Sequence, residues 1–127
     1  MPETADLDPV DLDPEDAKIV TLACAALART GADEGAAVRD TDGRTYTGCT
    51  VALPSLALTA LQAAIAAAVA SGATGLAAAA VVSRSVVSGT GSVDAASLAA
   101  VRELGPHAVV LLADQRGILT GVLSVAG

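Results

Sequence analysis

The stretch EGAAVRDTDGRTYTGCTV, residues 34–51, decides the fold. Small and apolar residues at 35–38 and Thr-Tyr-Thr at 45–47 flank the pair Asp42-Gly43, which is preferred in the tight turns that join two β-strands. The pattern predicts a β-hairpin that turns at Asp42-Gly43.

Helices and further strands are predicted on both sides of this hairpin, from apolar periodicity and from residues that start or stop helices. The predicted helices cover about Pro14–Arg29, about Ser55–Ser71 and Val93–Leu104, the last with Ser92 as its N-cap and Gly105-Pro106 as its stop. The predicted strands after the hairpin are Leu76–Val82, Ala108–Ala113 and Ile118–Val125. This order predicts an α/β fold, a three-layer α-β-α sandwich around a mixed five-stranded sheet.

The second predicted helix is apolar on nearly every face, and nearly half of its residues are alanine. Such a helix belongs in the middle of a domain or of an assembly. Because alanine adds little side-chain volume, neighbouring elements must approach the helix backbone closely. The pattern fits two arrangements: close helix packing across a symmetric interface, or burial within one subunit.

The chain has 127 residues, 53% of them hydrophobic, which suits one domain with a buried core. Its formal net charge of −7 is concentrated at one end, because residues 1–16 hold seven of the fourteen acidic residues and no basic one. We therefore expect an acidic disordered tail over 1–16 and a single domain over 17–127. The neutral domain offers no positive surface, so no nucleic-acid partner is expected.

Targeting and membrane signals are also missing from the sequence. No basic segment precedes an apolar one near residue 1, and the longest apolar stretch, 56–70, is shorter than the ~20 residues that span a bilayer. The sequence predicts a cytoplasmic protein without a membrane partner.

The segment Gly89-Thr90-Gly91-Ser92-Val93-Asp94 is a candidate nucleotide-binding turn, because it opens a predicted helix and a strand ending in Asp114 follows. Two features oppose this hypothesis. Asp94 stands where the third glycine is needed and would face a pyrophosphate, and only thirteen residues follow Asp114. We interpret the segment as an ordinary strand-to-helix loop.

Three segments together resemble one known family. They are the hairpin 34–51, the helix segment TALQAAI at 59–65 with Gly72 after it, and Leu104-Gly105-Pro106 followed by VVLLAD at 109–114. They are similar to the opening hairpin, the central helix and the segment after the second metal motif of the small zinc-dependent cytidine deaminases. The resemblance implies the cytidine deaminase fold and assembly into homotetramers or dimers.

The resemblance also implies where the chemistry should lie. In the family, a Cys-Ala-Glu run supplies a zinc thiolate and the general acid/base, and a Pro-Cys-x-x-Cys run supplies two more thiolates, which leaves one zinc position open for water. Here the first run reads Thr59-Ala60-Leu61, and the two later thiolates become Asp94 and Ser97. The family's ribose-binding Asn-x-Glu reads Thr50-Val51-Ala52.

No other residues rebuild the site in the sequence. Residues 50–104 contain no Cys or His, and their only acids are Asp94 and Glu103. Thr59, Asp94 and Ser97 offer one carboxylate and two hydroxyls, a poor cage even for a hard cation. An apolar Leu61 at the acid/base position disfavours the charged intermediate. We therefore predict no metal, no cofactor and no catalytic residue.

Cys24, Cys49 and His107 lie in other predicted elements. We interpret each cysteine as a small buried apolar residue. His107 directly follows a helix stop and lacks a visible nucleophile or orienting acid, so a surface or capping role is expected.

Three functional hypotheses follow. The first is an inactive deaminase-like protein with a structural, assembly or regulatory role, a homo-oligomer that can include an active relative. The second is a nucleoside-binding module that uses Thr50, Thr59 and Asp94. The third is a zinc-dependent cytidine deaminase or other hydrolase with an atypical site. A filled apolar pocket around Thr59, Leu61, Asp94 and Ser97 favours the first hypothesis, and an open polar pocket favours the second.

Overall fold

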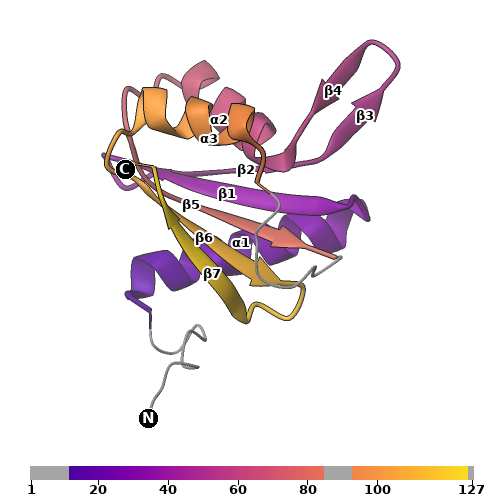
Figure 1. Ribbon diagram of the computed structural model, residues 1–127, viewed down its shortest axis with the longest axis horizontal. Helices are drawn as coiled ribbons and strands as arrows, with labels where there is room; N and C mark the ends of the chain where they lie inside the picture. The colour runs from indigo at the N-terminus through magenta and orange to yellow at the C-terminus, as the bar shows by residue number, and fades with distance from the viewer. Residues whose placement is uncertain (1–11, 85–92, 126–127) are drawn as a thin grey trace.

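The computed structural model describes residues 12–84 and 93–125 (Figure 1). Its helices are α1 (Pro14–Thr30), α2 (Ala60–Ala70) and α3 (Ala95–Leu104). Its strands are β1 (Glu34–Asp40), β2 (Thr45–Cys49), β3 (Val51–Leu53), β4 (Leu56–Leu58), β5 (Leu76–Ser83), β6 (Val109–Asp114) and β7 (Leu119–Ser124). The predicted N-cap Ser92, residues 89–91 of the candidate nucleotide turn and residues 1–11 of the predicted tail lie outside the described residues. Residues 14–16 of that tail belong to α1. Within the described ranges, no helix is long and apolar enough to cross a membrane.

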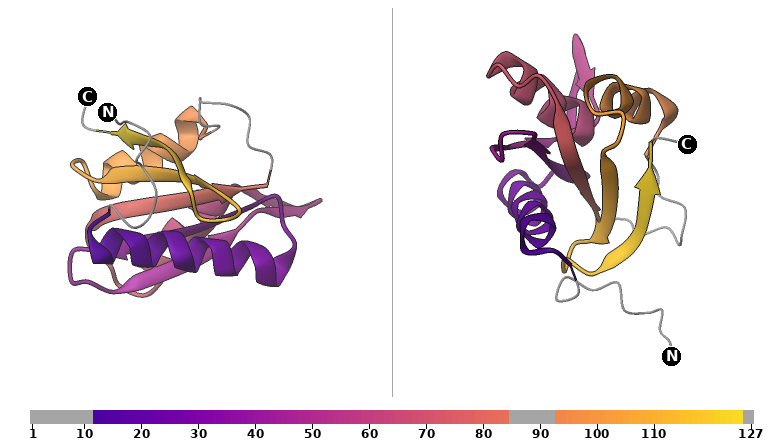
Figure 2. Two further views of the ribbon diagram at one scale, coloured as in Figure 1. Left: turned by 90° about the horizontal axis from the view of Figure 1, so that it is seen from below. Right: turned by 90° about the vertical axis from the view of Figure 1, so that its left-hand side faces the viewer.

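Five strands form one mixed sheet in the order β2-β1-β5-β6-β7. Strands β5 and β6 run parallel, and the other neighbouring pairs run antiparallel. Helix α1 covers one face of the sheet, and α2 and α3 cover the other (Figures 1 and 2). A separate cluster of buried apolar side chains fills each interface. The predicted three-layer α/β fold with a mixed five-stranded sheet is confirmed.

The first hairpin forms as predicted, with Gly35 opposite Cys49 and Val38 opposite Tyr46. Its turn is held by Asp40, which is buried. The Asp40 carboxylate accepts the backbone N–H groups of Asp42 (2.9 Å) and Arg44 (2.8 Å) and the hydroxyl of Tyr46 (2.8 Å). Although burial alone would raise the pKa of Asp40, these hydrogen bonds lower it.

The predicted start of the second helix at Ser55 is wrong. Strands β3 and β4 form a second hairpin that turns at Pro54-Ser55, and α2 begins only at Ala60. The start is fixed by a capping box. Thr59 Oγ1 accepts the N–H of Gln62 (3.1 Å), and Gln62 Oε1 accepts the N–H of Thr59 (3.0 Å).

Helix α3 begins at Ala95, two residues after its predicted start. Its N-cap is Asp94, whose carboxylate accepts the N–H of Ser97 at 2.9 Å. The strand-to-helix segment therefore places a capping carboxylate at Asp94.

The helices approach the sheet at backbone distance, as the alanine content of α2 predicts. A Cβ atom built on Gly48 of β2 would lie 2.5 Å from the backbone N of Ala64 and 2.8 Å from the backbone O of Ala60. On the other face, a Cβ atom on Gly35 of β1 would overlap the backbone O of Ala23 in α1. Both positions admit only glycine because the missing atom's place is taken by a helix backbone.

Replacement of Gly48 by alanine tests this packing. We expect Gly48→Ala to lower the free energy of unfolding by about 1–3 kcal/mol, the usual cost of overpacking. Chemical denaturation measures this change. Gly121→Ala in β7 is the matched control, because its Cβ would meet Leu112 Cδ1 at an ordinary 3.6 Å. Equal stability of the two variants would contradict the close contact of α2 with β2.

Candidate functional site

The N-termini of α2 and α3 meet on one face of the sheet. The hydroxyl oxygens of Thr59, at the start of α2, and Ser97, in the first turn of α3, lie 2.8 Å apart. Asp94 caps α3 beside them through the N–H of Ser97. The three positions that the family resemblance assigns to zinc thiolates thus come together, although the hydrogen-bonded pair is 38 residues apart in the chain.

The space between these two N-termini is nearly filled. The remaining cavity has a volume of about 10 Å³ and is lined by Glu34, Thr59, Leu61, Val81, Val93, Asp94 and Ser97. It has room for about one water molecule. Leu61, at the family's acid/base position, is 2% exposed and belongs to the core between α2 and the sheet.

These residues do not fit zinc. A catalytic zinc site needs three nitrogen, sulfur or carboxylate ligands with free lone pairs. Here the two hydroxyls are hydrogen-bonded to each other, and Asp94 is engaged as a helix cap. Across the part of the chain that the structure describes, no group of three His, Cys, Asp or Glu side chains is placed to hold a metal ion.

The cysteines and the histidine lie elsewhere. Cys24 is on α1, on the opposite face of the sheet, where burial and then the charge of Asp114 raise the pKa of its thiol. Cys49 ends β2, and both cysteines are free thiols. His107 is exposed and lines a separate cavity between Leu104 and β5. None of the three side chains lines the cavity at Thr59 or the cleft that continues outward from it.

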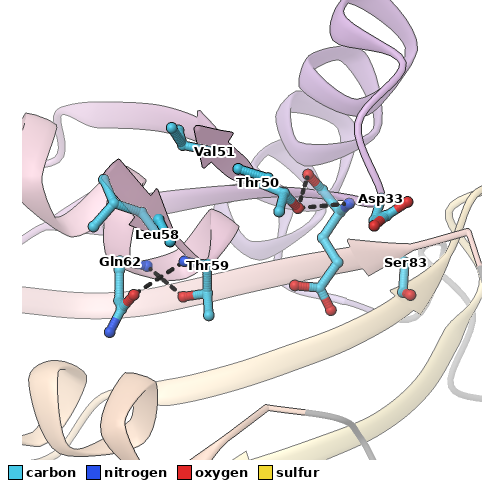
Figure 3. A pocket seen from close by; sticks show the side chains of 10 residues that line it. Asp33, Thr50, Val51, Leu58, Thr59, Gln62 and Ser83 are labelled. Carbon is cyan, nitrogen blue, oxygen red and sulfur yellow. Dashed lines mark hydrogen bonds between the residues drawn. The ribbon is translucent and has the colours of Figure 1, made fainter. Parts of the chain in front are cut away.

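An open cleft of about 660 Å³ continues outward from Thr59 (Figure 3). Its walls come from the start of β1, the β3–β4 hairpin, the start of α2 and the end of β5. The lining residues are Asp33, Glu34, Thr50, Val51, Ala52, Ala57, Leu58, Thr59, Gln62 and Ser83. The volume lies within the usual range of small-molecule sites.

The predicted ligand-binding residues divide between these two spaces. Thr50 and Thr59 both line the open cleft, whereas Asp94 lines only the small inner cavity. The Thr50 hydroxyl also ties β1 to the end of β2, because it accepts the N–H of Glu34 at 3.0 Å. The structure thus brings two of the three candidates to a space that is large enough for a ligand.

Glu34 is the site residue that the sequence reasoning missed. Its side chain lines both the cleft and the inner cavity. The sequence does contain a signal for this placement, because alternate residues of a β-strand lie on the same face of the sheet. Residue 34 therefore shares a face with Ala36 and Val38, which are buried under α2 and α3. Glu34 lies outside residues 50–104, the segment that holds the positions of the family's motifs.

The two acids of the inner cavity have opposite pKa shifts. Burial, and then the charges of Asp33 and Asp94, raise the pKa of Glu34 above its ordinary value of 4.5. Hydrogen bonds from Ser97, first from its hydroxyl and then from its N–H, lower the pKa of Asp94. The lowered pKa keeps Asp94 ionised at neutral pH, whereas burial and the neighbouring acids make the charged form of Glu34 unfavourable.

Glu34→Gln is therefore expected to stabilise the protein at pH 7, by about 0.5 kcal/mol, the scale of a solvent-screened charge interaction. The raised pKa means that the folded chain holds this proton more tightly than the unfolded chain. Stability then falls as pH rises from about 4.5 through the folded-state pKa, and it stays lower above that pKa. Thermal unfolding from pH 4 to pH 8 measures the effect.

Glu103→Gln, which removes an exposed carboxylate on α3, is the control for net charge. We expect Glu103→Gln to leave the stability at pH 7 unchanged. A Glu34→Gln variant less stable than the parent at pH 7 would show that the carboxylate is stabilised by its surroundings.

Comparisons with known proteins agree with this fold. A sequence model of the family described as cytidine deaminase-like matches residues 12–117. The fold is similar to that of the cytidine deaminase from Burkholderia pseudomallei, with a TM-score of 0.72 and 28% identity, covering 85% of this chain and 91% of that chain. The fold is also similar to that of cytidine deaminase from Mycobacterium leprae. The TM-score is 0.69 and the identity 27%, and the match covers 90% of this chain and 96% of that chain. For the cytidine deaminase from Mycobacterium tuberculosis the TM-score is 0.64 and the identity 27%, and the match covers 77% of this chain and 85% of that chain.

A search of the curated proteins found no match. The family match nevertheless spans α1 to the turn after β6, and so includes both helix N-termini at the site. The chain belongs to the cytidine deaminase-like family.

Proposed function

We propose that this chain is a zinc-free, catalytically inactive member of its family, with a regulatory or assembly role exerted through ligand binding in the open cleft. The observation that carries the proposal is the 2.8 Å hydrogen bond between Thr59 and Ser97. It joins two side chains that would otherwise have to face a metal ion, at positions where the family resemblance implies thiolates.

Deamination by zinc chemistry needs an activated water and a group that moves its proton. Thr59, Asp94 and Ser97 offer no thiolate or imidazole to a zinc ion, and the side chain at the acid/base position is the buried Leu61. An atypical zinc hydrolase, the third hypothesis, is therefore disfavoured by the chemistry of the donors themselves.

The cleft supports a binding role. It stays open at about 660 Å³ while the inner cavity holds about 10 Å³. The solved relatives are described as cytidine deaminases, which makes a nucleoside one candidate ligand. The chain's single aromatic residue is Tyr46, which does not line the cleft, so no ring is available there to stack on a pyrimidine.

Metal analysis with an ammonia-release assay on cytidine tests the inactive state. We expect no stoichiometric zinc in the purified protein and no turnover after zinc is added. The triple variant Thr59→Cys, Asp94→Cys, Ser97→Cys should gain one zinc per chain, because three thiolates then converge at the helix N-termini.

The matched control for the triple variant places cysteines outside the site, at Thr47, Ser71 and Ser124. It should not gain tightly bound zinc. Stoichiometric zinc together with cytidine turnover in the parent protein would refute the proposal.

We also propose that the chain forms a homo-oligomer, a dimer or a tetramer, or co-assembles with an active relative, through the β3–β4 hairpin. Leu53 and Leu56 face each other across this hairpin and are 59% and 49% exposed. The hairpin projects away from the sheet (Figure 1). A second copy offers these leucines an apolar groove of about 250 Å³ between α2 and α3, lined by Ile65, Val69, Ala100, Glu103 and Leu104.

Sedimentation and light scattering test this assembly. We expect the double variant Leu53→Ser, Leu56→Ser to shift the protein toward the monomer. Val122→Ser, which removes a 47% exposed side chain from β7, should leave the assembly unchanged. A parent protein that stays monomeric at high concentration would contradict self-association.

A further inference from the structure

The open cleft has one apolar side and one acidic side. The β3–β4 hairpin contributes Val51, Ala52, Ala57 and Leu58, and the chain just before and at the start of β1 contributes Asp33 and Glu34. In the view of Figure 3, Leu58 lies toward one end of the cleft and Asp33 and Ser83 toward the other. A ligand that fills the cleft therefore meets hydrocarbon at one end and carboxylates at the other.

No positive charge balances these carboxylates. Within residues 12–84 and 93–125, none of the basic side chains lines the cleft, and the sequence of residues 85–92 contains no charged residue. Arg84 directs its guanidinium to the backbone O of Ala32 (2.8 Å) and of Leu27 (3.4 Å). Among the described residues, the Glu34 carboxylate has no hydrogen-bond or ion-pair partner, and Asp94 adds a further negative charge behind it.

A half-buried carboxylate without a partner costs stability, and a cationic ligand would remove that cost. A bare metal ion is a poor match, because Mg²⁺ and Ca²⁺ need a shell of oxygen ligands and the cleft offers hydrocarbon over much of its wall. A pyrimidine nucleoside is also a poor match, because the cleft has no aromatic side chain and the Asn-x-Glu positions hold Thr50 and Ala52.

We infer that the cleft binds a small organic cation, a primary alkylamine with a short apolar body, whose ammonium group sits against Glu34 and Asp33 while its carbon chain packs on Val51 and Leu58. This inference rests on the binding role proposed above and names the class of ligand. Thr50, Thr59 and Gln62 also line the cleft, and their polar groups are available for additional hydrogen bonds with such a ligand.

A five-carbon series separates charge from shape. Pentylamine, pentanol and pentanoate share one apolar body and differ in the charge of the head group, and cytidine is added as the nucleoside probe. Titrations followed by amide NMR should show pentylamine shifting the signals of Thr59 and Gln62, with pentanol and pentanoate at least roughly tenfold weaker.

Three variants test where the ammonium group of the ligand binds. Glu34→Gln should weaken pentylamine binding roughly tenfold, the effect of one lost charge-assisted hydrogen bond. Asp33→Asn should weaken it less, because Asp33 is more exposed. Glu15→Gln, which removes an exposed carboxylate from α1 on the opposite face of the sheet, should leave it unchanged. Since Glu34→Gln is expected to stabilise the fold, lost binding in that variant would not come from unfolding, and its melting temperature is measured in parallel.

The outcomes separate this inference from the proposed binding role. Pentanol binding as tightly as pentylamine, or unchanged pentylamine affinity in Glu34→Gln, overturns the cationic ligand. Cytidine binding in the cleft without pentylamine binding also overturns it, but leaves the binding role standing. If no probe shifts the cleft signals, both the inference and the binding role fail.

Discussion

The position of α2 on the sheet depends on one contact between backbones, the contact at Gly48. A single methyl group there would collide with the main chain of α2 at Ala60 and Ala64, so the close approach of the helix to β2 requires glycine at this position. Together with the capping box of Thr59 and Gln62, which fixes where the helix begins, this contact sets where the Thr59 hydroxyl lies. The hydrogen bond to Ser97 across 38 residues of chain depends on that placement.

Two of the three positions that correspond to the family's metal ligands are also helix-capping positions. Thr59 and Asp94 are N-caps, and Ser97 donates its N–H to the Asp94 carboxylate. Threonine and aspartate are both preferred N-cap residue types. In this chain the side chains at these positions therefore stabilise the helix starts by themselves, without a metal. The hydrogen bonds of Ser97 with Thr59 and Asp94 close the inner cavity, while the cleft beyond Thr59 stays open.

Much of the fold is predictable from residue patterns, because Asp42-Gly43, the alanine helix and the buried strands are local signals. The second hairpin was missed because Val51–Leu58 is as apolar as the helix after it, and only the capping pair Thr59 and Gln62 separates them. At the site, the family resemblance predicts that Thr59, Leu61, Asp94 and Ser97 lie together. Glu34 reaches the same cavity because β1 pairs with β2 and β5. Strand pairing is set by tertiary contacts, and a single segment of sequence does not encode these contacts by itself.

Tyr46 gives the molecule an unusual optical property. It is the only aromatic side chain in the chain, and its hydroxyl donates to the buried Asp40 at 2.8 Å. All near-ultraviolet absorbance and intrinsic fluorescence from side-chain rings thus originate at the β1–β2 turn. A spectroscopic unfolding curve reports the opening of that turn, and events in the cleft stay invisible to it unless they reach the turn.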